Sequence, residues 1–287
     1  ALGDVNADGF DDVAIGAPGY DGVGTDSGDV LVRMGAANQA SMGLLVLSGA
    51  TAGERFGGAV AGLGDLDGDG FADLGVGSPE FVSTGGTSGQ IKVFFGSATG
   101  LTATAGFVSV GSNQDQAQFG LSIAGVGDVN GDGFDDFAVG APGQTTSAGA
   151  MAGAVHVFFG DASRSFATVA IYDSPIADAA LGKRVAGVGD TNGDGYADIL
   201  VGAPDHDPGG LPFAGMARLL LGGANVTGQG FDVAVDLVGG SANEELGSSL
   251  AGLGDVNGDG FTDWVVGRPG AMNSYGESGA GVAEVHF

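Results

Sequence analysis

Cysteine is absent from this 287-residue chain, and only eight residues are lysine or arginine. The first absence excludes a disulfide framework and any thiolate metal site, although it leaves the compartment open. The scarcity of basic residues, against 35 acidic ones and a net charge of −27, disfavours binding to nucleic acid or insertion into anionic membranes. No apolar run is long enough for a membrane span, so none is predicted.

Glycine and short apolar runs are abundant instead. Glycine occupies 61 positions without a collagen-like triplet period, and 43% of the residues are hydrophobic. This composition predicts a packed core with many turns rather than a disordered acidic chain. The acidic residues recur in clusters along the chain, which indicates a cation as their partner.

One acidic stretch occurs five times, starting at residues 3, 64, 127, 189 and 254. The copies read GDVNADGFDDVAIGAP, GDLDGDGFADLGVGSP, GDVNGDGFDDFAVGAP, GDTNGDGYADILVGAP and GDVNGDGFTDWVVGRP. Their leading aspartates, Asp4, Asp65, Asp128, Asp190 and Asp255, are separated by 61, 63, 62 and 65 residues. A period this regular is typical of a repeat architecture.

Each repeat contains four β-type runs. Small residues and glycine precede the acidic loop, as in 56–65, and a run such as 136–142 follows it up to a proline. After a variable loop come two more runs, such as 153–160 and 167–173. Four short strands per repeat predict a propeller blade, because a solenoid has a shorter period and a sandwich needs about 100 residues.

We therefore expect an all-β fold. It is one β-propeller domain over 1–287, built from four-stranded antiparallel blades, with repeat units near 1–53, 54–116, 117–178, 179–243 and 244–287. Because the chain opens at Ala1 in the tail of a first strand and stops at Phe287 in a third strand, we expect one incomplete blade with an exposed edge. Further sequence of a longer chain, which we favour, or a neighbouring molecule would complete it.

The acidic loop has nine positions with constant chemistry. Positions 1, 5 and 9 are Asp, position 3 is Asn or Asp, position 6 is Gly and position 7 is aromatic. Ca²⁺ takes six to eight oxygen ligands, which the side chains at 1, 3, 5 and 9 and the carbonyl at 7 can supply, while Gly at 6 permits a sharp turn. The predicted ligands, for about five Ca²⁺ ions, are Asp4, Asn6, Asp8, Phe10, Asp12, Asp65, Asp67, Asp69, Phe71, Asp73, Asp128, Asn130, Asp132, Phe134, Asp136, Asp190, Asn192, Asp194, Tyr196, Asp198, Asp255, Asn257, Asp259, Phe261 and Asp263.

Magnesium, an EF-hand and a plain hairpin turn each fit the loop less well than calcium does. Mg²⁺ demands a rigid octahedron and keeps its waters. An EF-hand needs Glu at position 12, where every copy has Ile or Val. Simple Asp-Gly or Asn-Gly hairpin turns would not keep the same oxygens five times. The second loop has four carboxylates, because Asp67 replaces Asn, so we expect it to bind calcium most tightly if all else is equal.

These motifs resemble the FG-GAP repeats of the integrin α-subunit propeller. Phe-Gly appears at 56–57 and 119–120 and as Leu-Gly at 181–182 and 246–247; Gly-Ala-Pro appears at 16–18, 140–142 and 202–204, and as variants at 77–79 and 267–269. The resemblance implies blades around a central axis, a Ca²⁺ loop between the first two strands of each, and ligands on the opposite face. Integrins have seven repeats with calcium on only some, whereas five intact loops here look more like bacterial secreted or surface FG-GAP proteins.

The resemblance predicts an extracellular, secreted or surface-attached module for binding or adhesion, stabilised by calcium, with a protein or glycan ligand. One alternative is the propeller domain of a secreted enzyme of the polysaccharide lyase or phospholipase type. Another is a subunit of a head-to-tail filament that self-associates through its incomplete blade. The few, scattered basic residues, without a nucleophile elbow or phosphate loop, favour binding over catalysis.

A few single residues remain as candidates. His156 and His286 lie in β-type runs and are predicted to be ordinary strand residues, and His206 is predicted to lie in a solvated turn. Trp264 is predicted to be a core residue. The aromatic residues of the variable loops are candidate ligand contacts: Tyr20, Phe81, Phe213 and Tyr275.

Overall fold

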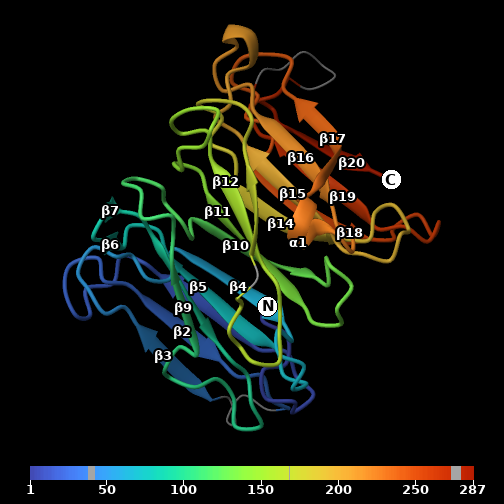
Figure 1. Ribbon diagram of the computed structural model, residues 1–287. Helices are drawn as coiled ribbons and strands as arrows, with labels where there is room; N and C mark the ends of the chain where they lie inside the picture. The colour runs from blue at the N-terminus through green and yellow to red at the C-terminus, as the bar shows by residue number, and fades with distance from the viewer. Residues whose placement is uncertain (38–42, 168, 273–278) are drawn as a thin grey trace.

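The computed structural model describes residues 1–37, 43–167, 169–272 and 279–287. In these residues three four-stranded and two three-stranded antiparallel sheets follow one another along an arc (Figure 1). This confirms the predicted all-β fold class with propeller-type blades. The described helices are single turns, α1 (Val226–Gln229) and a 3₁₀ turn at Pro208–Gly210, and neither has the length to cross a bilayer.

The five sheets correspond to the five repeats in chain order. Their strands are β1 (Val13–Ala17), β2 (Asp29–Arg33) and β3 (Leu44–Ser48); β4 (Ala59–Gly64), β5 (Asp73–Ser78), β8 (Gln90–Phe94) and β9 (Phe107–Val110); β10 (Ser122–Gly127), β11 (Asp136–Ala141), β12 (Ala154–Phe158) and β13 (Val169–Asp173); β14 (Arg184–Gly189), β15 (Asp198–Ala203), β16 (Met216–Leu221) and β17 (Asp232–Val238); and β18 (Ser249–Gly254), β19 (Asp263–Arg268) and β20 (Val282–His286). A small ribbon, β6 (Val82–Ser83) with β7 (Gly86–Thr87), lies between β5 and β8.

The hydrophobic core is divided into layers, each between two neighbouring sheets. Between the second and third sheets, for example, Leu63 and Ile91 share one cluster with Phe119 and Phe137. The second strands of the three inner sheets are buried along their whole length, because side chains on both of their faces meet a neighbouring sheet. This double burial explains why these strands read as continuous apolar runs instead of alternating ones.

The first strands β4, β10, β14 and β18 lie side by side near the centre of the arc (Figure 1). Each carries a glycine at the crossing point, and a Cβ at Gly125 would stand 2.9 Å from the backbone of Leu63 in the preceding sheet. Gly187 and Gly252 face Val126 and Val188 in the same way. Glycine is therefore required where the sheets converge, since backbones approach there more closely than side chains allow.

A second set of glycine contacts joins the two sequence motifs across each interface between sheets. The glycine of Gly-Ala-Pro packs on the glycine of the next repeat's Phe-Gly or Leu-Gly, so that a Cβ at Gly140 would overlap the carbonyl oxygen of Gly182. The same contact occurs at Gly16–Gly57, Gly77–Gly120 and Gly202–Gly247. At Gly267, in the last repeat, the described atoms nearest to a new Cβ all belong to Ser249 of its own sheet.

The first and last sheets lie at opposite ends of the arc (Figure 1). On the first sheet Ile15, Leu31 and Val46 are direct cross-strand neighbours, and they are 57%, 36% and 46% exposed. We call these three residues the apolar stripe. At the equivalent positions of the second and third sheets, Val76 and Val139, the counterparts of Ile15, are fully buried, whereas Val108 and Ile171, the counterparts of Val46, are 48% and 50% exposed.

The glycine contact between sheets predicts the effect of a single methyl group. Gly140→Ala should lower the free energy of unfolding by about 1–3 kcal/mol, because the new Cβ must push two packed sheets apart. Gly267→Ala adds the same methyl where only the Ser249 side chain has to move, and it should change stability by less than about 0.5 kcal/mol. Urea unfolding of both variants is the measurement, and equal losses would contradict this account of the interface.

Candidate metal centres

In the second to fifth sheets the acidic loop begins where a β-bulge turns the chain out of the first strand. Pairing shifts register between Gly62 and Gly64, and at the same place in the third to fifth sheets. Gly64 has φ +81°, a conformation that glycine adopts without strain. The bulge re-aims the following residues, so that the loop closes back on its own first aspartate.

That first aspartate organises the loop through backbone hydrogen bonds. In the second loop the Oδ1 of Asp65 accepts the N–H groups of Gly68 and Asp69 at 2.8 and 3.1 Å, and its Oδ2 accepts the N–H of Gly70 at 2.8 Å. Gly70 has φ +90°, which confirms the sharp turn predicted at position 6. The bond from position 6 recurs in the other four loops at 2.8–2.9 Å.

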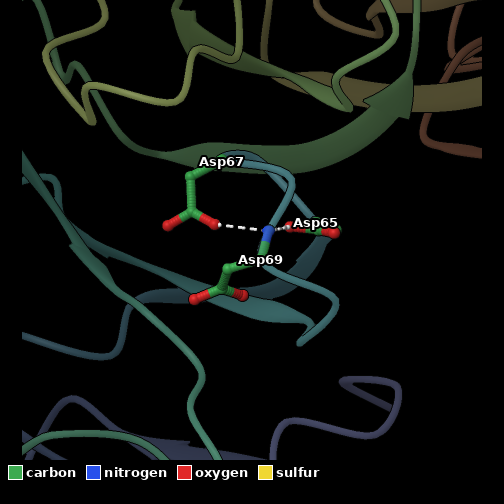
Figure 2. A group of neighbouring side chains, drawn as sticks. All are labelled: Asp65, Asp67 and Asp69. Carbon is green, nitrogen blue, oxygen red and sulfur yellow. Dashed lines mark hydrogen bonds between the residues drawn. The ribbon is translucent and has the colours of Figure 1, made fainter.

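The side chains at positions 3 and 5 continue the pattern. Asp67 Oδ1 accepts the N–H of Asp69 at 3.0 Å, and Asp69 Oδ1 accepts the N–H of Phe71 at 3.1 Å. Figure 2 shows the three carboxylates gathered on the inside of the curled loop. Like charges so close repel each other, and the N–H donors offset only part of that repulsion.

The donor set of the second loop fits a hard divalent cation. One oxygen from each of Asp65, Asp67 and Asp69 lies within 4.8 Å of the others. Ligands at 2.3–2.6 Å from a shared Ca²⁺ are separated by at most about 5 Å, so these oxygens are already close enough to share an ion. The other four loops have Asn in place of Asp67 and the same backbone bonds at positions 5 and 7.

The position-nine aspartates lie deeper than the rest of the loop. Asp73 is fully buried, and its two oxygens accept the N–H groups of Leu66 at 3.0 Å and of Gly96 at 2.8 Å. It therefore ties the loop to the end of the third strand, a role that the sequence did not reveal. Each oxygen retains a further lone pair, so a metal-ligand role at position 9 stays a prediction.

Burial makes two of the position-nine aspartates, Asp73 and Asp136, harder to ionise. It raises the pKa of Asp73 and of Asp136 to about 7, although two backbone N–H groups at each carboxyl act in the opposite direction. A carboxyl with such a pKa is only partly ionised at neutral pH. A divalent cation in the loop would favour the charged form and so relieve the cost of burying it.

The five loops form a continuous row. The N–H of position 8 donates to the carbonyl oxygen of position 1 in the preceding loop, from Ala72 to Asp4 at 3.2 Å and from Ala197 to Asp128 at 2.9 Å, with equivalent bonds at the other two junctions. The ring of Phe134 also lies against Gly68 of the loop before it. Five acidic loops are thus brought to the same side of the arc, a juxtaposition that concentrates negative charge there.

Two of the three histidines are buried. His156 lies in β12 with its Nε2 2.9 Å from Gln144 Oε1, and burial lowers its pKa to about 4, so it is a neutral strand residue as predicted. His206 is also buried, at 8% exposure, and does not lie in the predicted solvated turn. The ring of His286, in β20, stacks on buried Trp264 with centroids 3.9 Å apart.

The aromatic residues of the variable loops differ in exposure. Tyr20, between β1 and β2, is 55% exposed, and Phe213, between β15 and β16, is 49% exposed. Phe81 is half-buried, and Tyr275 lies outside the described residues. These loops follow the second strand of their blades, at the end opposite the acidic loop.

Comparison with known proteins agrees with this architecture. The model of the FG-GAP repeat matches residues 1–32, 56–94, 119–158, 184–220 and 246–283, together more than half of the chain. Integrin alpha-5 of Xenopus laevis is 38% identical over 154 residues, which are 50% of this chain and 14% of the integrin. Integrin alpha-PS2 of Drosophila melanogaster is 31% identical over 220 residues, 71% of this chain and 15% of the integrin. The chain thus spans about one seventh of the length of these relatives.

The buried carboxylate tie can be separated from metal binding by two substitutions in the third loop. In chelator, Asp136→Ala should lower the free energy of unfolding by at least about 2 kcal/mol, because it leaves the buried N–H groups of Val129 and Gly160 without an acceptor. Asp132→Ala, at an exposed position of the same loop, should cost less than about 0.5 kcal/mol in chelator. Chemical denaturation without calcium is the measurement, and a similar small loss for both variants would refute the tie.

Proposed function

This chain belongs to the FG-GAP repeat family, and from that premise we propose that it is a calcium-stabilised propeller module for binding or adhesion at the cell exterior. The observation that carries the proposal is the row of five loops with one donor arrangement on a single side of the arc. We propose one domain over 1–287, with the repeat units predicted from the sequence. The similarity to integrin α subunits supports an adhesive role and an extracellular or cell-surface location.

About five Ca²⁺ ions are proposed, one for each loop, held by the residues at positions 1, 3, 5, 7 and 9. Their chemical role is structural. Each ion neutralises carboxylates that the fold brings close together. Without such ions, the self-repulsion of a chain with a net charge of −27 would oppose the compact state. Because the empty loops repel and the filled ones do not, calcium binding adds directly to folding stability. Millimolar calcium outside cells suits sites of modest affinity.

The proposed ligand side is the opposite one. There the loops between the second and third strands vary in length and sequence from one repeat to the next, while the acidic loops do not. Exposed Tyr20 and Phe213 lie in such loops, and aromatic residues of this kind often carry binding energy in interfaces. A protein or glycan ligand is proposed on this surface.

Removing calcium is the test of the proposed metal role. Calcium at ten times its dissociation constant adds about 1.4 kcal/mol for each site, so five sites in a chain of this size raise the melting temperature by about 10 °C. Chelator should abolish this increment, and calcium should restore it, as followed by calorimetry. Magnesium at the same concentration is the control and should restore much less.

An unchanged melting temperature in chelator would refute the calcium proposal. The ligand side is tested on the same calcium-loaded protein, by comparing its binding to glycan and matrix-protein arrays with that of the Tyr20→Ser/Phe213→Ser variant. Loss of any array signal in that variant, at unchanged melting temperature, is the expected result. Retained binding would remove this surface as the ligand site.

Self-association is a second candidate function, favoured by the apolar stripe on the first sheet. Ile15, which is 57% exposed, corresponds to the fully buried Val76 and Val139 of the second and third sheets. We propose that a second copy packs its last sheet on this stripe in a head-to-tail manner. Calcium would assist the contact, because it lowers the mutual repulsion of two acidic molecules.

Sedimentation at increasing protein concentration in calcium tests this contact. The sedimentation coefficient should rise with concentration, and Ile15→Asp should keep the protein monomeric, because it places a charge at the most exposed residue of the apolar stripe. Val108→Asp, on the outer strand β9 of the second sheet, is the matched control at a similarly exposed position. A single monomeric species at all concentrations would exclude self-association.

A further inference from the structure

Within the described part of the chain, the second acidic loop has a cationic neighbour that the other four lack. Arg164 lies in the connection between β12 and β13 of the third sheet, 95 positions from the second loop. Its Nη2 donates to Asp69 Oδ2 at 2.8 Å, and its Nε pairs with Asp67 Oδ2. Among the described residues, no other ion pair reaches a carboxylate at positions 1 to 9 of an acidic loop.

The arginine takes over a hydrogen bond that the other loops make internally. In these loops position 3 is Asn, and its side-chain N–H group donates to the Oδ2 of the position-5 aspartate at 2.9–3.3 Å. The second loop has Asp67 at position 3, which offers no donor. The Nη2 of Arg164 reaches the same Oδ2 atom of Asp69 from the neighbouring sheet.

The presence of Asp67, where the other loops have Asn, also changes the charge of the second loop. The second loop has four aspartates at the ligand positions, against three in each of the others. Asp135 of the third loop adds to this concentration, because its Oδ2 accepts the N–H of Asp65 at 2.8 Å. The single positive charge of Arg164 returns the ligand set of the second loop to the net charge of its neighbours.

Arg164 is held in position by contacts on both sides. The N–H of Arg164 donates to the carbonyl oxygen of Asp161 at 3.0 Å, and the Asp161 carboxylate accepts the N–H of Ser163 at 2.7 Å, which braces the turn. The guanidinium lies over the ring of buried Phe95, 4.4 Å from its centroid. A charge stacked in this way is directed at the carboxylates rather than free to swing into solvent.

We propose that Arg164 is a built-in counter-cation of the second loop, which stabilises that loop without metal and lowers its calcium affinity to the level of the other four. Only the statement about calcium affinity rests on the proposed function; the stabilisation without metal does not. The fourth carboxylate would make the second loop the tightest site if all else were equal, but the arginine offsets its charge. Arg164 also joins the acidic loop of the second sheet to the third sheet, to which Arg164 itself belongs.

The test without metal uses the pair Asp67 and Arg164. In chelator, Arg164→Gln should lower the folding equilibrium constant about fivefold, since it leaves the fourth carboxylate unbalanced. In an Asp67→Asn background, which recreates the sequence of the other loops, the same substitution should change that constant by less than about twofold. Arg164→Lys should retain only part of the effect, because lysine lacks the planar fork.

The test with calcium follows each loop by the NMR signal of its position-6 amide, such as Gly70 in the second loop and Gly133 in the third. Arg164→Gln should raise the calcium affinity reported by Gly70 about fivefold and leave that of Gly133 unchanged. An unchanged Gly70 affinity, or equal destabilisation with and without the Asp67→Asn substitution, would overturn the inference, since Arg164 would then only pack on Phe95. If no glycine amide responds to calcium, the proposed function fails, and the metal-free cycle alone decides the role of Arg164.

Discussion

The second strands of the inner sheets are apolar on both faces, and a sheet of short strands cannot bury either face alone. In this protein every inner sheet is covered by the sheet before it and the sheet after it, and the core consists of the layers between them. The close approach of the first strands, which only glycine permits, is a direct consequence. So is the contact between the Gly-Ala-Pro and Phe-Gly motifs, because these motifs meet where one repeat is packed on the next.

The same stacking of sheets brings the negative charges of neighbouring loops close together. Repeats that pack in register place their acidic loops side by side, and backbone hydrogen bonds between loops hold them there. Backbone N–H groups and one arginine offset part of the repulsion. A row of divalent cations is the remaining means of balance that the donor chemistry supports, which is why the proposed function assigns calcium a structural role and leaves the opposite side for ligands.

Much of the acidic loop could be predicted from the sequence, because its structure is local. Asp65 bonds to N–H groups three to five residues further on, and such spacing is visible in the chain itself. The partners of Asp73 at Gly96 and of Asp69 at Arg164 were not predictable, since no pattern marks a contact 23 or 95 residues away. The solvated turn predicted for His206 was wrong for the same reason: packing of neighbouring elements buries it.

By itself the sequence determined the strands, their number per repeat, the all-β propeller class and the nine-position loops with their oxygen donors. These features depend on short apolar runs between turn residues and on hydrogen bonds within a few residues, and the fivefold repeat shows which positions matter. Only the tertiary structure decided that the loops stand in one row, that the position-nine aspartates are buried ties, and that the second loop has its own cation. Those features arise between repeats, where the distance in space is set by the packing of whole sheets and is independent of separation along the chain.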